Sequence, residues 1–360
     1  GGGGGVAAVA DVLIKLIRLI AHLAMGLAEG AAIAAAPESA SLLRLLSALP
    51  LEPTLVGDAP PLCIEELQLN ALSAVTNLTF YTAGGGSALL GAPGATGSLP
   101  QGTNGGGVGV GCAGGGAAIG DVWSCHQRAL CGLLAQALTH PNAEAAAEAA
   151  RALGNISRLP PARLTLCELL ADEALLILLE HPSAQVCRAS CGALINLSSD
   201  PRCLSRLGSL SAVPRVAAAT LRLLDAANAA ALADGDGGAT PSTDRAEEAL
   251  SRSADEAADG AEAEAAAVLA AKTLCNLLSS RPVDAADTVE GQGAALDEPL
   301  RRAVLRAAAA AAAEKNAARW RDESSRAEWP QVAALLTQLA TVCASAPRTA
   351  AMHSVAVGDK

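Results

Sequence analysis

Asparagine is the polar residue that recurs in the most constant context in this chain. Asn77, Asn155, Asn196 and Asn276 each lie three residues after Ala or Thr and directly before Leu or Ile. A carboxamide donates and accepts hydrogen bonds at once, which suits it to pair with the backbone of an extended peptide. The alternative is that each amide fixes a neighbouring helix end or loop inside the repeat. The sequence leaves both roles open.

The cysteines and histidines offer little chemistry beyond packing. Cys187 and Cys191 lie one helical turn apart and His181 precedes them, but the chain contains no Cys-x-x-Cys pair and no further ligand at suitable spacing. We therefore predict buried reduced thiols, no metal and no cofactor. The histidines and serines form no nucleophile–base set that can be read from sequence, so we predict that the chain is not an enzyme. An enzyme with an unrecognised site stays as an alternative.

Two further motif matches carry no functional weight. The run from Gly109 to Gly114 matches the dinucleotide fingerprint, but it lies in a glycine-rich segment with no preceding strand and no βαβ unit. Three of the asparagines also match the Asn-x-Ser/Thr glycosylation pattern. Because the repeated motif itself generates that match within helices, we expect no glycosylation there.

An internal repeat supplies the elements that would position the asparagines. The segments from Leu138 to Ser157 and from Leu179 to Ser198 align without gaps, with His-Pro and Asn each recurring 41 residues on. Leucine and alanine recur at three- and four-residue spacing, which is the period of a helix. A helical repeat of about 41 residues falls in the range of armadillo and HEAT repeats.

Two inserts interrupt the period. The asparagines are spaced 78, 41 and 80 residues apart, and the long gaps contain a glycine-rich segment and an acidic segment. We expect both inserts to be disordered or loosely ordered, the first through glycine entropy and the second through charge. The predicted organisation is degenerate and first clear repeats at 6–82, a glycine-rich insert at 83–120, central repeats at 121–224, an acidic insert at 225–261, a last repeat with capping helices at 262–346, and a tail at 347–360.

Composition excludes several classes of protein. Aromatic residues make up 1% of the chain, which argues against an all-β fold and against base stacking on single-stranded nucleic acid. The net charge is −11, most of it in the acidic segment, and no basic face is evident, so we expect no nucleic-acid partner. Charged residues interrupt the apolar run that follows Val6, so we predict a buried helix there and no membrane insertion.

These observations predict an all-α, armadillo-type α-solenoid, a right-handed superhelix of helical repeats with two low-complexity inserts. Its third helices would line the concave face, and His22 stands where a decayed repeat would carry its asparagine. We predict a partner-binding face made by Asn77, Arg151, Asn155, Asn196, Lys272 and Asn276. Import receptors of this fold carry Trp four residues before the asparagine. Those positions here are Ser73, Arg151, Gly192 and Lys272, so recognition of nuclear signals is disfavoured.

The order of the motifs resembles the ciliary armadillo-repeat family. The segments that carry the resemblance are Asn70–Tyr81, Glu148–Arg158, Cys187–Asp200, Ala271–Leu278 and, at the C-terminal end, Trp329–Leu339. The two large inserts depart from the family pattern.

The resemblance implies a scaffold or transport adapter of motile cilia, located in the axoneme of cilia or flagella and in the cytoplasm. Its partners would be radial spoke subunits and the intraflagellar transport machinery. The alternative is a general cytosolic peptide-binding adapter of catenin or importin type. The sequence leaves open the oligomeric state, the identity of the partner, and the choice between transient transport and permanent residence in the axoneme.

Overall fold

The computed structural model describes residues 3–36, 38–49, 61–81, 119–233 and 243–279, together with residues 330, 334 and 337. Within these ranges the chain forms α-helices and no β-strand, so the prediction of an all-α fold is confirmed for this part of the chain. The chain divides into two compact units, residues 1–175 and residues 176–360.

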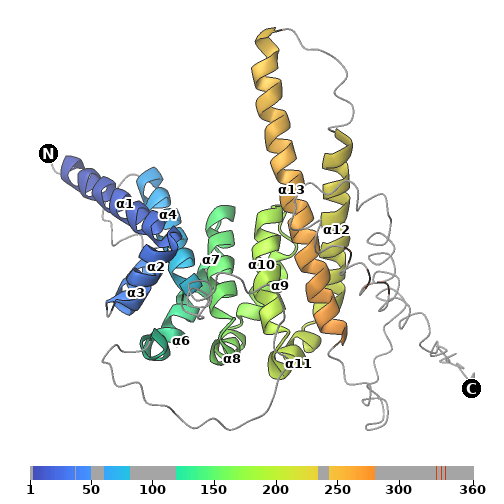
Figure 1. Cartoon of the computed structure of the whole chain (residues 1–360), viewed down its shortest axis with the longest axis horizontal. Helices are drawn as coiled ribbons and strands as arrows, with labels where there is room; N and C mark the ends of the chain where they lie inside the picture. Colours follow the sequence, from blue (N-terminus) through green and yellow to red (C-terminus); the bar gives the residue numbers. More distant parts are fainter. Residues whose placement is uncertain are drawn as a thin grey trace, which may run out of the picture. The chain divides into compact units, whose positions relative to one another are not determined.

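In the first unit, the helices α1 (Gly3–Met25), α4 (Pro61–Phe80) and α7 (Ala143–Ile156) pack side by side in the order in which they follow along the chain. The other helices of this unit are α2 (Leu27–Ala35), α3 (Ser39–Ala48), α6 (Ile119–Ala137), α8 (Pro160–Glu168) and the first half of α9 (Ala171–Leu178). α1 packs on α4 and α4 packs on α7, while α3 packs on α6 beside them. We call α1, α4 and α7 third helices, because α4 and α7 carry the repeated asparagine and α1 carries His22 (Figure 1).

The second unit repeats this arrangement. Its helices are α10 (Ala184–Leu197), α11 (Pro201–Ser209), α12 (Ala212–Ala233) and α13 (Thr243–Ser279). Its third helices are α10, which carries Asn196, and α13, which carries Asn276. α13 packs on α10 and also runs along α12, as Figure 1 shows. Along the sequence, α8, α9 and α10 are followed by α11, α12 and α13, so the helices recur in groups of three. A three-helix repeat of about 41 residues is the armadillo pattern, and the chain is an α-solenoid of this type.

Backbone conformation gives an independent measure of the period. Leu170 and Ser211, which lie 41 residues apart, are the described non-glycine residues with positive φ, at 60° and 55°. Each forms the turn between the first and second helix of its repeat. The Leu170 N–H donates to the carbonyl of Cys167 at 3.2 Å, and the Ser211 N–H donates to the carbonyl of Gly208 at 3.2 Å. The turn is therefore copied from repeat to repeat together with the helices.

The recurring histidines also belong to the repeat. The Nδ1 of His140 accepts a hydrogen bond from the backbone N–H of Asn142 at 3.1 Å, and the Nδ1 of His181 accepts one from the N–H of Ser183 at 3.0 Å. Both rings therefore hold the loop that leads into the third helix. These histidines therefore belong to the architecture of the repeat.

The acidic insert differs from the prediction. Residues 225–261 were expected to be disordered, but α12 continues to Ala233 and α13 begins at Thr243. Alanine and glutamate have high helix propensity, and the two helices pack against one another. Propensity and packing therefore outweigh the charge in this segment. The acidic segment lengthens a helical hairpin and does not replace it by a loop.

The other predicted segments fall mostly outside the described residues. The glycine-rich insert at 83–120 lies there except for its last two residues, which begin α6. The capping helices expected up to residue 346 and the tail at 347–360 lie there as well, apart from residues 330, 334 and 337. The right-handed superhelix stays a prediction.

Candidate functional site

All six residues predicted to bind a partner lie on third helices. In the first unit Asn77 is on α4, and Arg151 and Asn155 are on α7. In the second unit Asn196 is on α10, and Lys272 and Asn276 are on α13. All six residues are half-buried. Half-burial suits both a peptide-binding surface and a packing contact, so their bonding partners must decide between the two.

In the first unit, the asparagine amides bind the preceding third helix. The Nδ2 of Asn155 donates to the carbonyl of Thr76 at 3.0 Å and to the Oγ1 of Thr79 at 3.3 Å, both on α4. The Nδ2 of Asn77 donates to the carbonyl of Ala21 on α1 at 3.0 Å. Each amide therefore joins its own third helix to the one before it.

The second unit uses the same register. The Nδ2 of Asn276 donates to the Oγ of Ser198 at 3.1 Å and, more weakly, to the carbonyl of Ile195 at 3.5 Å. In all three cases the accepting carbonyl lies one residue before the asparagine position of the preceding third helix. On α1 that carbonyl belongs to Ala21, so His22 occupies the asparagine position, as predicted.

A hydroxyl two residues after Asn77, Asn155 and Asn196 completes a small network, whereas Asn276 is followed at that position by Leu278. The hydroxyl donates at 2.8 Å to the carbonyl one residue before the asparagine, as in the pairs Thr79 with Thr76, Ser157 with Gly154, and Ser198 with Ile195. These three hydroxyl-bearing residues are buried. Carbonyls in the last turn of a helix lack backbone donors, and the side chains supply them. The Asn-x-Ser/Thr pattern is therefore a packing motif, which explains why it resembles a glycosylation sequence.

The structural role left open by the sequence is thus realised for Asn77, Asn155 and Asn276. Their peptide-binding role stays a prediction. The atoms that would bind a peptide are the Oδ1 atoms of these three asparagines, to which no described residue donates a hydrogen bond. An Oδ1 atom is an acceptor for the backbone N–H of an extended chain.

A cationic position lies one helical turn before the asparagine position. Arg151 and Lys272 occupy it on α7 and α13, and Arg18 occupies it on α1. Sequence reasoning missed Arg18, although His22 four residues later was the signal that could have found it. Arg18 pairs with Glu66 of α4, and Arg151 pairs with Glu148 at 3.0 Å.

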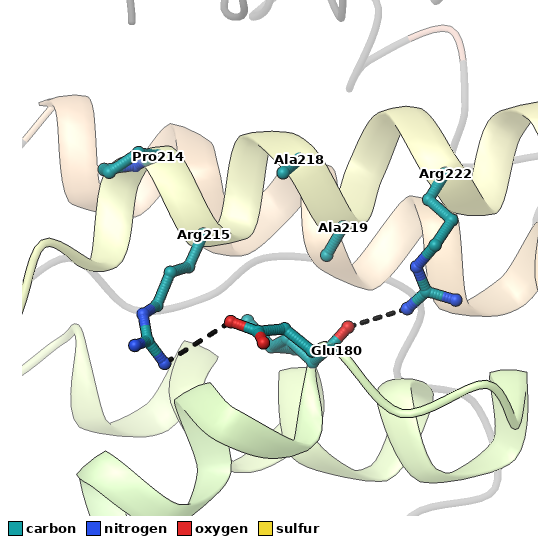
Figure 2. A pocket seen from close by; sticks show the side chains of 7 residues that line it. Glu180, Pro214, Arg215, Ala218, Ala219 and Arg222 are labelled. Atoms are coloured by element: carbon teal, nitrogen blue, oxygen red, sulfur yellow. Dashed lines mark hydrogen bonds and ion pairs between the residues drawn. The ribbon is translucent and has the colours of Figure 1, made fainter.

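A hollow of about 450 Å³ opens in the second unit between α12 and the segment that follows α9. Figure 2 shows Arg215 and Arg222 reaching from α12 towards this segment, with Ala218 and Ala219 between them. Arg215 pairs with Glu180 at 3.6 Å, while the Nη2 of Arg222 donates to the carbonyl of Leu179 at 2.7 Å. Both guanidiniums therefore tie α12 to the end of the preceding second helix.

The thiols are structural. Burial raises the pKa of Cys131 to about 12 and that of Cys275 to about 11, and it also raises the pKa of Cys191. The Sγ of Cys187 lies 3.3 Å from the carbonyl of His181 and 3.2 Å from the Nη2 of Arg222. The prediction of buried, reduced thiols is confirmed for Cys187 and Cys191.

No group of three His, Cys, Asp or Glu side chains suited to a metal ion occurs among the described residues. None of the described helices is both long and apolar enough to cross a membrane. The glycine-rich Gly109–Gly114 match lies outside the described residues.

Among known proteins, only solved structures are similar to this chain. No protein-family model matches the chain, and no curated protein does. Among solved structures, one engineered protein is 16% identical, with 92% of each chain covered and a TM-score of 0.48. A designed armadillo repeat protein is 15% identical, with 91% of this chain and 92% of that chain covered and a TM-score of 0.48. Another designed armadillo repeat protein, solved in complex with the peptide (KR)4, is 15% identical with the same coverage and a TM-score of 0.47. The repeat architecture of this chain stands on its own contacts and period.

Proposed function

We propose that the chain is a non-enzymatic adapter that binds extended segments of protein partners along its third helices. The residues involved are Asn77, Arg151 and Asn155 in the first unit and Asn196, Lys272 and Asn276 in the second. The observation that supports the proposal is the repeated register, in which the amides of Asn77 and Asn155 lie on successive third helices and a cation lies one turn before that position on α1 and α7.

The spacing of third helices fits an extended partner. Packed helices lie about 8–10 Å apart, and an extended chain advances about 3.3 Å per residue. A partner lying across the row would therefore present every second or third residue to the next helix. The Oδ1 of Asn77 or Asn155 would accept a backbone N–H of that partner, and Arg18 or Arg151 would pair with its carboxylates.

The partner is therefore expected to be acidic. Arg18 and Arg151 are each held by a single carboxylate, from Glu66 and Glu148. A guanidinium has five donors, so each can bind a second carboxylate without losing the first. This chemistry also separates the site from a receptor for basic nuclear signals.

A direct test uses two ten-residue peptides labelled with fluorescein, one with Glu and one with Lys at every second position. Fluorescence anisotropy should show the Glu peptide binding more tightly. Changing Arg18 and Arg151 together to Gln should weaken binding of the Glu peptide about tenfold. Two exposed charge pairs are then lost, and each contributes up to about 1 kcal/mol. Arg44→Gln is the matched control, since Arg44 is exposed on the second helix α3. Equal affinity for both peptides, or equal loss in the control, would refute the proposal.

At a finer level, we propose that this adapter serves motile cilia, in assembly of radial spokes of the axoneme. The support is the order of repeat motifs, which resembles that of armadillo repeat-containing protein 2. The competing function is a general cytosolic peptide-binding adapter. Localisation of the tagged full-length protein separates the two. Accumulation in the axoneme, with spoke defects on deletion, supports the ciliary role, whereas a nuclear or junctional location supports the other.

A further inference from the structure

Helix α1 has a second apolar face that no described residue covers. One face, which includes Ile14 and Ile17, is buried, and α1 packs on α4 and α2. On the outer face, Val12, Leu16 and Leu19 are 62%, 50% and 54% exposed, and Leu23 is 42% exposed. A helix that is apolar on opposite faces is built for burial on both.

The register of the repeat shows what this outer face corresponds to elsewhere. Aligning His22 with the four asparagines places Val12, Leu16, Leu19 and Leu23 on positions that are between 0% and 3% exposed in α4, α7, α10 and α13. The outer face of α1 therefore corresponds, position by position, to the face that each of the other third helices buries. We call Val12, Leu16, Leu19 and Leu23 the α1 stripe.

The size of the side chains distinguishes the α1 stripe from those inner surfaces. At the two central positions the inner third helices carry small residues, as in Ala71 and Ala74 of α4. Small residues let helices approach closely, whereas leucines hold helix axes further apart. In α1 both central positions are leucine, Leu16 and Leu19. The stripe is therefore shaped for a leucine-rich helix and less well for the alanine-faced packing used inside this chain.

We propose that the α1 stripe pairs with the α1 stripe of a second copy of the chain, in an antiparallel arrangement around a two-fold axis. The spacing of the stripe, four, three and four residues, is symmetric about its centre. Val9, which is 60% exposed, extends the same face by one turn and would lie opposite Gly26 of the second copy. An antiparallel copy therefore brings Val12 opposite Leu23 and Leu16 opposite Leu19. An isologous contact requires this self-complementarity, and the spacing matches a coiled-coil seam.

Charge and area agree with pairing. The cations that border the stripe are already neutralised, Lys15 by Asp11 at 2.7 Å and Arg18 by Glu66. The four side chains of the stripe present on the order of 400 Å² of apolar surface, which is comparable with the largest patch of a typical monomer. This is about half of the ~800 Å² per partner of a standard interface. The dimer is accordingly expected to be of moderate affinity, forming at micromolar concentration.

Sedimentation velocity of the full chain from about 1 to 100 μM tests the pairing. We expect a concentration-dependent species at twice the chain mass of 35.6 kDa. Changing Leu16 and Leu19 together to Glu should yield a monomer over the whole range. Leu45→Glu, at an exposed leucine on α3, is the matched control and should leave the dimer intact. Helicity and melting temperature should change little in either variant, because these leucines are half-exposed.

A complementary variant separates loss of pairing from loss of fold. A chain with Leu16 and Leu19 changed to Lys should also be monomeric, and mixing it with the Glu variant should restore a dimer. Restoration supports the antiparallel contact. A parent chain that stays monomeric at every concentration overturns the proposal and leaves the stripe for a helix of a different protein. A dimer that persists in the Glu variant, or two folded variants that fail to pair, also overturns it. The pairing is measured without the Glu peptide, and the Glu variant is not used to measure peptide binding, because Leu19 adjoins Arg18 on α1.

Discussion

Replacing Asn155 by Ala should loosen the contact between α4 and α7. The change removes one good hydrogen bond, to the carbonyl of Thr76 at 3.0 Å, and one longer bond, to the Oγ1 of Thr79 at 3.3 Å. A neutral hydrogen bond contributes about 1 kcal/mol net, and the longer bond adds a few tenths. The Thr76 carbonyl is not orphaned, because the Thr79 hydroxyl still donates to it at 2.8 Å. Because Ala has a higher helix propensity than Asn, the substitution also adds about 0.5 kcal/mol to the free energy of unfolding.

The net loss should therefore be about 1 kcal/mol, which corresponds to roughly fivefold faster amide exchange in α4 and α7. Hydrogen exchange read by mass spectrometry is the suitable assay, because a repeat array need not unfold in one step. His22→Ala is the matched control. It changes the same register position on α1, where the ring nitrogen contacts only the Arg18 carbonyl of its own helix among the described residues.

Two results would refute this reasoning. Exchange in α4 and α7 could be unchanged in Asn155→Ala, or the His22→Ala control could accelerate it equally. Either outcome would mean that the cross-helix amide bond adds nothing to stability. If the Asn155→Ala chain were equally stable but lost affinity for the Glu peptide, the amide would serve the partner and not the fold.

Packing and burial lead to four further predictions. Gly30→Ala should lower the melting temperature by several degrees, because a Cβ there would come within 2.4 Å of the buried Tyr81 ring. Leu170→Gly should raise stability by about 0.5–1 kcal/mol in a denaturant titration, because φ is 60° and the left-handed conformation strains a leucine. Iodoacetamide should modify half-exposed Cys63 and spare buried Cys131 at pH 8, as mass spectrometry of peptides would show. Because burial raises the pKa of Cys131 from 9.0 to about 12, its contribution to stability should be present below pH 9 and lost as the pH rises towards 12.

The sequence predicted the parts of the fold that recur locally. The 41-residue period, the helical spacing and the place of His22 all follow from short patterns that need no tertiary information. The cross-helix direction of the asparagine bonds does not, because an amide can donate to a neighbouring helix or to a partner with the same chemistry. The ion pair between Arg188 and Glu262, at 2.8 Å, was equally hidden. Its partners are separated by the acidic segment, so their register appears only once α12 and α13 are seen as one helical hairpin.

The prediction of disorder in the acidic segment was wrong for a different reason. The composition of the segment was treated as a measure of disorder, whereas the alanines that dilute the acids are the strongest helix formers. A segment of mixed Ala, Glu and Asp can therefore stay helical if one end is anchored. Here the anchor is the packing of α13 on α10, including the bond from the Thr273 hydroxyl to the carbonyl of Cys191.

The amide network answers a problem that an alanine-rich core creates. Alanine faces such as those of α4 and α7 are smooth, so neighbouring third helices meet little steric resistance to sliding along one another. Apolar burial is non-directional and changes little with such a slide. A hydrogen bond has a narrow geometry, so the bonds from Asn77 to Ala21 and from Asn155 to Thr76 hold only in one register. The same bonds fix the spacing at which Arg18 and Arg151 recur. An extended partner can meet Arg18 and Arg151 at once only if the distance between them is constant, so the residues that set the register of the fold also prepare the surface proposed for binding.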